Sequence, residues 1–357
     1  YLNGLQDGIS DNDWAKADAA LAELKNYQRA TSAAILPSVS RVKAEVFYNK
    51  ASVFKKLVYC YMILGGIALV LALFGALCGK RFALAQKILF AAFATSFAAH
   101  TLALALRWYV AAHAPWSDSY ESMIYIGWSA ALAGIIFFRK SLLTLSASCL
   151  LASIVMLVAH MSFVNPQITN LVPVLKSYWL SIHVSVITAS YGFLGLSCLL
   201  GLLALVLMAL KNSANRERLN AQIRYITAIN EISLIVGLSM LTLGNFFGGI
   251  WANESWGRYW GWDSKETWSY VSIIVYAIVL HLKFIPKLGS IYVYCVSSTL
   301  AYSSIIMTYF GVNFYLTGMH SYAAGDAPQI PAPFYCIIAA IFLIIALAFR
   351  GRDVKTI

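Results

Sequence analysis

The chain has 357 residues, of which 60% are hydrophobic and only 11% are charged, and its mean hydropathy is +0.71. An average soluble domain carries about 25% charged residues, so this composition excludes a soluble enzyme. The net charge of +11 would suggest nucleic acid binding in a soluble protein, but in a membrane protein it indicates Lys- and Arg-rich loops on one side, and no nucleic acid partner is expected.

Residues 1–57 predict a small helical hairpin ahead of the first apolar run. Trp14, Ala17, Leu21 and Leu24 recur at three- to four-residue spacing, after an Asp-Asn-Asp sequence that can cap a helix. A proline ends this helix, and a second helical stretch runs into the first span. Such a hairpin could dock a partner or act as a packing lid. Because the chain begins with Tyr and shows no signal sequence, we expect it to be part of a longer or processed polypeptide.

Nine apolar runs approach or exceed the about 20 residues that a helix needs to cross roughly 30 Å of hydrocarbon. They predict an all-α, polytopic integral membrane protein with about nine transmembrane helices, forming one domain over residues 58–357. The predicted spans are 58–78, 86–110, 120–138, 142–164, 177–210, 227–250, 267–285, 291–316 and 334–349. The fifth is too long for one perpendicular crossing, so it must project into water or tilt.

The distribution of cations predicts the orientation in the membrane. One set of alternate loops contains fourteen Lys and Arg residues and the other set contains four. The positive-inside rule places the richer set and the C-terminus in the cytoplasm, and it places residues 1–57 and the loop at 250–268 outside.

Six cysteines all lie within apolar runs, and none forms a C-x-x-C pair. A disulfide framework, a zinc cluster and a thiol-disulfide centre are therefore not expected, and we interpret these residues as small buried apolar side chains.

Five of the ten tryptophans crowd into the segment 250–268. They are Trp251, Trp256, Trp260, Trp262 and Trp268. An interfacial belt distributes its tryptophans over many helix ends, whereas this density favours a platform for a flat hydrophobic macrocycle. A merely interfacial amphipathic loop is the alternative interpretation.

The histidines support a haem interpretation, because haem iron is commonly held by imidazole. His183 lies near the external end of the fifth span, and His320 lies in the external segment after the eighth, so both share a membrane face with the tryptophans. We predict them as an axial pair. His281 lies near the inner end of the seventh span, about 20 Å below Trp268, and is either a separate transmembrane haem ligand or a snorkelling side chain. No other histidine matches its depth, so its partner would have to come from outside this chain.

Charged residues near the tryptophans each have two interpretations. Asp263 and Glu266 have the spacing of a helix cap and its reciprocal partner, as do Asp118 and Glu121 before the third span; for the first pair, a role in orienting an axial imidazole is the alternative.

Two cations close to the tryptophans, Arg258 and Lys265, could meet haem propionates or lipid headgroups. The sequence contains no C-x-x-C-H, so any haem would be bound noncovalently.

The segment WGRYWGWDSKETW followed by His281 resembles the WWD domain of the cytochrome c assembly family. The segments SYWLSIHV, PWSDSYESM and GVNFYLTGMHSYA narrow the resemblance to System II proteins of the CcsA type, and to the C-terminal part of a fused CcsB-CcsA (CcsBA) synthetase. Together these motifs cover most of residues 108–325.

The resemblance implies a role in cytochrome c maturation in the bacterial cytoplasmic membrane. In such proteins haem b crosses the membrane and is joined by thioethers to the CXXCH motif of apocytochrome c, which is the activity of a holocytochrome c synthase (cytochrome c haem lyase). Partners implied are the CcsB portion, apocytochrome c and a thioredoxin-like thiol reductant. His183 and His320 match the external pair, His281 matches a membrane ligand, and the WWD signature corresponds to Trp256, Trp260, Trp262 and Asp263.

Two other functions remain open from the sequence. A haem exporter or chaperone could use the same external face without forming thioethers. A b-type cytochrome linked to quinone would need histidine pairs at matching depth, and the depths found here do not match.

Overall fold

The computed structural model describes residues 1–11, 14–33, 35–138, 141–161, 164–171, 176–316, 318 and 330–354. Throughout these residues the regular structure is helical, and no strand is present. The chain divides into two compact units, Tyr1–Ala51 and Ser52–Ile357.

The first unit contains α1 (Leu2–Asp11), α2 (Trp14–Ser32) and α3 (Val39–Ala51). The amphipathic pattern predicts α2, but α1 is not predicted. These two helices pack closely, since a Cβ atom at Gly4 would lie 3.1 Å from the Cβ atom of Ala20. The expected cap residues at 12 and 13 lie outside the described residues.

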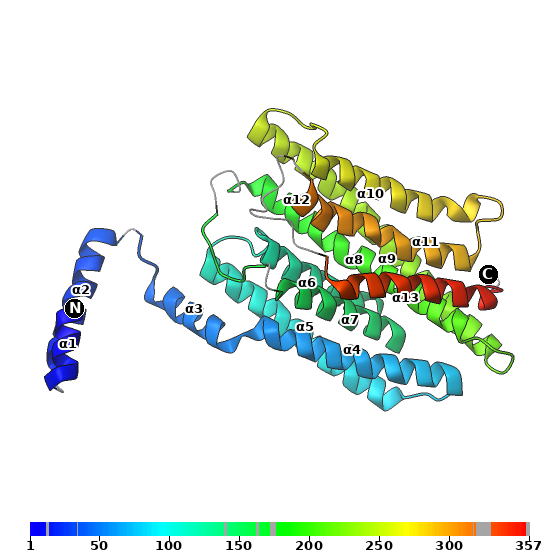
Figure 1. Cartoon of the computed structure of the whole chain (residues 1–357), viewed down its shortest axis with the longest axis horizontal. Helices are drawn as coiled ribbons and strands as arrows, with labels where there is room; N and C mark the ends of the chain where they lie inside the picture. The colour runs from blue at the N-terminus through cyan, green and yellow to red at the C-terminus, as the bar shows by residue number, and fades with distance from the viewer. Residues whose placement is uncertain are drawn as a thin grey trace. The chain divides into compact units, whose positions relative to one another are not determined.

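The second unit is a bundle of membrane-length helices (Figure 1). Its helices are α4 (Val53–Cys78), α5 (Ala83–Ala111), α6 (Ser119–Phe137), α7 (Leu142–Ala159), α8 (Tyr178–Ala209), α9 (Arg216–Trp256), α10 (Ser264–His281), α11 (Ile291–Ile306), α12 (Val312–Tyr315) and α13 (Ala332–Ala348). A π-helical turn, Met307–Gly311, joins α11 to α12, and short 3-10 turns follow α10 and α13. Among the described residues, nine helices are long and apolar enough to cross a membrane, which confirms the predicted fold class.

Two of the differences between the predicted and the observed helix boundaries bear on the fold and the site. The second predicted helix does not run unbroken into the first span, because Ser52 adopts the left-handed region with φ of 45° and separates α3 from α4. Helix α9 continues through Trp251 to Trp256, residues that we expected in a loop. It ends only where Gly257, with φ of 70°, donates its N–H to the Asn253 carbonyl as a C-terminal cap.

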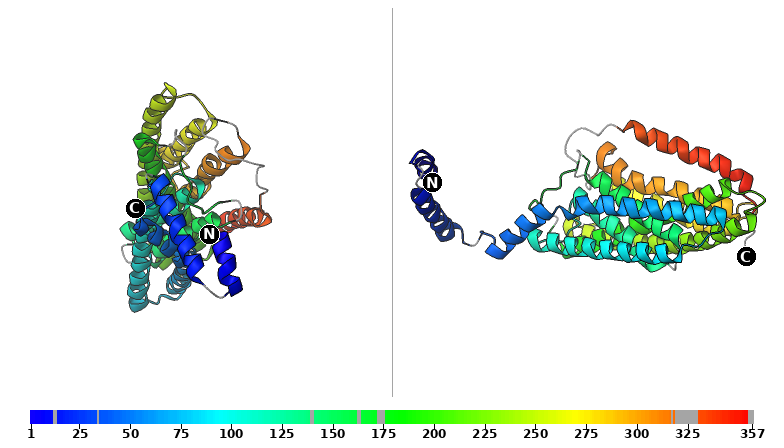
Figure 2. Two further views of the ribbon diagram at one scale, coloured as in Figure 1. Left: turned by 90° about the vertical axis from the view of Figure 1, so that its left-hand side faces the viewer. Right: turned by 90° about the horizontal axis from the view of Figure 1, so that it is seen from below.

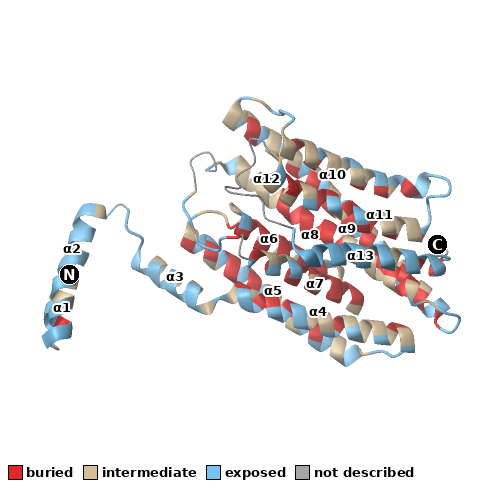
Figure 3. Cartoon of the chain, in the orientation of Figure 1, coloured by how far each residue is buried: buried red, intermediate tan, exposed pale blue. Residues whose placement is uncertain are grey.

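The core of the second unit lies around α6, α7 and α8, whose apolar stretches are mostly buried (Figure 3). By contrast, α13 is almost wholly exposed and lies at the edge of the bundle (Figure 2). Helix α8 packs along α9, and the contact includes Tyr191, Leu194, Leu234 and Leu241. Gly237 makes this approach feasible, because a Cβ atom there would lie 2.7 Å from the Leu194 side chain.

We therefore expect Gly237→Ala to destabilise the bundle by about 1–3 kcal/mol, because the added methyl group overpacks the contact between α8 and α9. The measurement is the thermal unfolding midpoint in detergent. Gly66→Ala in α4 is the matched control, since a Cβ atom there meets nothing within 4 Å, and its midpoint should not fall. Equal midpoints for Gly237→Ala and the wild type would contradict this account of the packing.

Candidate functional site

Residues of five helices and of the loops between them line a cavity of about 510 Å3, and these loops include the one between α9 and α10, which contributes Tyr259 and Trp260. Its walls come from the segment that begins α6, the loop at 169–171, the first turns of α8, the last turns of α9, the start of α10, and the π-turn with α12. We name it the His183 cavity after the histidine in its wall. Its volume is within the range of about 300–1,000 Å3 that is usual for small-molecule and cofactor sites.

His183 lies in the second turn of α8, and its protonation pattern follows from one contact. Its Nδ1 atom is 2.7 Å from the Gly244 carbonyl oxygen on α9. A carbonyl oxygen only accepts hydrogen bonds, so Nδ1 carries the hydrogen and donates it. In the neutral ring the lone pair therefore lies on Nε2. A hydrogen bond from the other ring nitrogen to a carbonyl or carboxylate oxygen gives metal-binding histidines the same arrangement.

Gly248 allows the His183 ring to approach the backbone of α9. A Cβ atom at position 248 would lie 2.6 Å from Cε1 and 2.7 Å from Nδ1 of His183. One turn earlier, a Cβ atom at Gly244 would meet Ile187 at 3.0 Å. Sequence reasoning missed both glycines, although their four-residue spacing on one helix face is the signal that could have identified them.

The five clustered tryptophans occupy different environments. Trp251 and Trp260 line the His183 cavity. Trp256 packs edge-on against Trp251 with ring centroids 4.7 Å apart, and Trp262 packs edge-on against Trp260 at 5.7 Å. Trp262 is itself 70% exposed. Trp268 lies on α10, where its carbonyl oxygen accepts a hydrogen bond from Thr308 of the π-turn. Two of the five rings therefore form cavity wall.

The loop between α9 and α10 is held by a capping box. Asp263 accepts hydrogen bonds from the backbone N–H groups of Lys265 and Glu266, and the Glu266 side chain accepts from Gly261 N at 2.7 Å and from Asp263 N at 3.4 Å. Trp262 adopts φ of 58°, which is uncommon for a residue with a side chain. The capping box holds the loop in this conformation directly beside the cavity.

The two predicted cations behave differently. The Arg258 guanidinium lies 3.7 Å from Glu266 and over the ring of Trp256 at 5.7 Å, and this residue is not part of the cavity wall. Lys265 is in the wall, and its Nζ atom donates a hydrogen bond to Asn313 Oδ1 at 3.1 Å.

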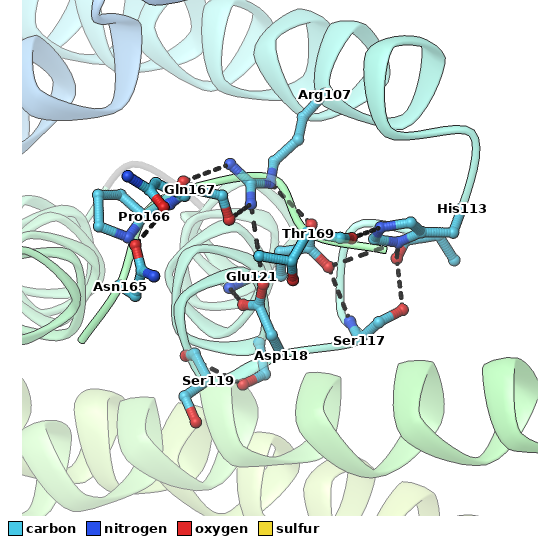
Figure 4. Close-up of polar contacts among 12 residues, drawn as sticks. Arg107, His113, Ser117, Asp118, Ser119, Glu121, Asn165, Pro166, Gln167 and Thr169 are labelled. Carbon is cyan, nitrogen blue, oxygen red and sulfur yellow. Dashed lines mark hydrogen bonds and ion pairs between the residues drawn. The ribbon is translucent and has the colours of Figure 1, made fainter. Parts of the chain in front are cut away.

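A buried charged cluster supports the loop that forms one wall, and the sequence did not predict it (Figure 4). Arg107 and Glu121 are fully buried and form an ion pair of 2.8 Å. The remaining guanidinium nitrogens of Arg107 donate to the carbonyl oxygens of Pro166 and Gln167 at 3.1 and 3.5 Å. Because residues 169–171 of the same loop line the cavity, this Arg107 cluster positions that wall.

The other histidines are placed as follows. His320 lies outside the described residues, so its approach to His183 stays a prediction. His281 is exposed at the end of α10, and its Nδ1 atom lies 2.7 Å from the Ala277 carbonyl oxygen of the same helix.

The three histidines that were not predicted as ligands have protein partners. His100 is buried between the Ile124 carbonyl and the Tyr61 hydroxyl. His113 contacts the Arg107 cluster, and His160 bonds the Met156 carbonyl.

Removal of the Arg107 charge should be costly, because it leaves the Glu121 carboxylate buried without its partner. We expect Arg107→Met to lower the stability of the membrane unit by about 3–5 kcal/mol, measured as unfolding in detergent, and Arg107→Met/Glu121→Gln to recover part of the loss. The control is Lys283→Met, which breaks a largely exposed ion pair with Glu231 and should cost about 0–1 kcal/mol. Similar losses for Arg107→Met and Lys283→Met would refute the assignment.

Asp118, at the cavity wall, should make stability depend on pH. Burial, reinforced by the neighbouring Glu121 charge, raises the pKa of Asp118 from 3.8 to about 6. The folded protein thus binds this proton more tightly than the unfolded chain does. The resulting contribution to the free energy of unfolding is complete below about pH 3.8 and is lost as the pH rises through about 6. Asp118→Asn keeps a good N-cap. The fall in unfolding midpoint between pH 5 and pH 7 should be smaller in Asp118→Asn than in the wild type. An equal fall in the two proteins would show that the pKa of Asp118 is not raised.

Comparison with known proteins gives a consistent result. A family model described as cytochrome c assembly protein matches residues 116–320, more than half of the chain. Protein NrfI of Wolinella succinogenes is 48% identical over 326 residues, which are 90% of this chain but 36% of NrfI. The CcsA proteins of Prochlorococcus marinus strain MIT 9301 and of Chlorella vulgaris are 32% and 33% identical, each over 62% of this chain and over 80% and 81% of their own lengths. The chain belongs to the cytochrome c assembly protein family.

Proposed function

We propose that this chain binds haem b noncovalently in the His183 cavity and presents it for thioether attachment to the CXXCH motif of apocytochrome c. The observation that carries the proposal is the His183 imidazole, whose Nδ1 is committed to the Gly244 carbonyl at 2.7 Å within a cavity walled by Trp251 and Trp260. His320 would supply the second external ligand.

The side chains that line the His183 cavity suit a haem, both in their chemical nature and in the protonation state of the imidazole. A neutral imidazole with its lone pair on Nε2 is the form that binds iron. Aromatic walls from Trp251, Trp260 and Tyr309 match the large apolar faces of a porphyrin. Asp263 and Glu266 act through the loop, because their carboxylates hold backbone N–H groups. We assign them a positioning role for the tryptophans.

The reaction requires proximity more than acid–base chemistry from this chain. Bound haem supplies the vinyl groups, and the S–H bond of each substrate cysteine adds across a vinyl C=C bond, with sulfur and hydrogen both retained in the product and no net redox change. The chain's task is to hold the macrocycle still, exclude water with tryptophan and tyrosine side chains, and leave an edge open to the peptide. Such pre-orientation can supply a large part of a rate acceleration. This corresponds to a holocytochrome c synthase.

His281 is proposed as the ligand of a second haem within the membrane. Its Nδ1 bonds to Ala277 of its own helix, which places the lone pair of the neutral ring on Nε2, and the side chain is exposed on an apolar helix. An imidazole on a lipid-exposed face is costly unless something covers it. His100 is an unsuitable partner, because both of its ring nitrogens already face the Ile124 carbonyl and the Tyr61 hydroxyl. We propose that a CcsB portion supplies the second ligand.

The remaining assignments follow from the same proposal. The protein would lie in the bacterial cytoplasmic membrane, with the tryptophan loop and the N-terminal hairpin at the periplasmic side and the C-terminus in the cytoplasm. NrfI extends well beyond the region that matches this chain, and we propose a CcsB portion, fused as in CcsBA proteins or separate, as a partner of this chain. Apocytochrome c and a thioredoxin-like reductant that keeps its thiols reduced would be the other partners.

The test is His183→Gly in the protein purified from cells that also produce an apocytochrome c. We expect loss of most of the external haem signal and of cytochrome c maturation, and partial recovery of the haem spectrum when imidazole is added, because a free ligand can occupy the vacated position. His160→Gly is the matched control, since His160 bonds a backbone carbonyl outside the cavity, and it should retain both properties.

Wild-type haem content and maturation in His183→Gly would overturn the proposal. Loss of maturation without any change in the haem spectrum would equally count against a ligand role. If the wild type binds haem and releases it to an acceptor but forms no thioether with apocytochrome c, the chain is a haem exporter or chaperone.

A further inference from the structure

The His183 cavity contains a lysine, Lys265, that forms no ion pair with a carboxylate in the described part of the chain. Lys265 lines the cavity, and its ammonium group donates to the neutral Asn313 amide oxygen at 3.1 Å. Within the described part of the chain, the Asp263 carboxylate attracts this ammonium group at longer range but does not form an ion pair with it. A cation taken partly out of water usually has an anionic partner.

The two acidic neighbours of Lys265 in sequence are committed elsewhere. Asp263 Oδ1 accepts from the backbone N–H groups of Lys265 and Glu266 at 3.0 and 2.9 Å. Glu266 accepts from Gly261 N and faces Arg258. The capping box therefore fixes the backbone of Lys265 without an ion pair to its ammonium group.

Asn313 is presented to the cavity by an irregular helix. The π-helical turn Met307–Gly311 adds residues to the turn before α12, and Thr308, Tyr309 and Asn313 all line the cavity. Thr308 is tied to α10 through Ser272 and the Trp268 carbonyl, each at 3.1 Å. Single π-turns of this kind are frequent at functional sites. The turn brings Asn313 to Lys265, which lies 48 residues earlier in the chain.

We propose that Lys265, oriented by Asn313, is the carboxylate-binding group of the His183 cavity and holds a propionate of the haem. This inference rests on the proposed function. It distinguishes between the two cations near the tryptophans, because Arg258 is paired with Glu266 and lies outside the cavity wall. A charge-assisted hydrogen bond to one propionate would fix the in-plane orientation of the porphyrin and hence which edge stays open to the peptide.

A lipid phosphate could satisfy the same ammonium group, so the test must separate the two sources. Haem b and its dimethyl ester, which has no charged propionates, are titrated into wild-type protein, Lys265→Met and Lys265→Arg in nanodiscs made only of zwitterionic lipid. Lys176→Met is the matched control, because Lys176 is exposed just before α8. Each titration is followed by the spectrum of the imidazole-bound haem.

The wild type and Lys176→Met should bind haem b about ten- to a hundredfold more tightly than its dimethyl ester. Lys265→Met should bind the two forms alike, with haem b weakened to the level of the ester, and Lys265→Arg should restore much of the preference. The ester titration doubles as a folding control, because the variant must still bind the ester as the wild type does.

Three results would overturn the inference. They are equal binding of haem b and its ester by the wild type, a preference that survives in Lys265→Met, and a Lys265 effect that appears only when anionic lipid is added to the nanodiscs. A wild type that binds neither form at His183 would instead refute the proposed function itself, so the two failures can be told apart.

Discussion

The close contact between α8 and α9 is the constraint on which the site depends. Gly237, Gly244 and Gly248 remove side chains from one face of α9, so that α8 can lie against its backbone. At the buried end of the contact, Leu194 packs against Gly237. At the cavity end, the His183 ring lies against Gly248, and its Nδ1 atom donates to the Gly244 carbonyl. The same interhelical packing therefore stabilises the bundle and selects the tautomer of the proposed ligand. A larger residue at position 248 would displace the ring without any change to the histidine itself.

Charge is handled in two contrasting ways around the cavity. Arg107 and Glu121 are both fully buried, and they satisfy each other and the carbonyl oxygens of the loop at 166–167. Such a cluster is complete without a ligand, which is why we give it a structural role. Lys265 is in the wall, and the hydrogen-bond acceptor of its ammonium group among the described residues is the neutral amide of Asn313. A rigid wall on one side, and on another a cation without an ion-pair partner among the described residues, suit the anionic, largely apolar ligand that we propose.

The local sequence pattern was sufficient to predict the helices but not the contacts between them. The nine apolar helices could be predicted because length and hydropathy are properties of short windows, and the capping box at Asp263 and Glu266 because its partners are three residues apart. The continuation of α9 to Trp256 depends on where a glycine permits a left-handed cap, and tryptophan content alone suggested a loop. The bond of His183 to Gly244 joins residues 61 apart, and Arg107 reaches loop residues 59 and 60 positions away. Contacts of this range leave no periodic trace in a single sequence.

Two of the three proposed haem ligands, His183 and His281, differ in how much of their surroundings this chain provides. His183 is enclosed by residues from α6, α8, α9, α10 and α12, and its orientation is fixed by a second helix. Among the residues that the structure describes, the His281 ring bonds its own helix at the Ala277 carbonyl, and it is exposed beside Phe284, which is 72% exposed. An imidazole and an aromatic ring at the end of an exposed helical face require either lipid headgroups or another polypeptide to complete their environment. The His183 cavity is thus formed by this chain's own packing, whereas the site proposed at His281 would form only when a second element covers that face of α10.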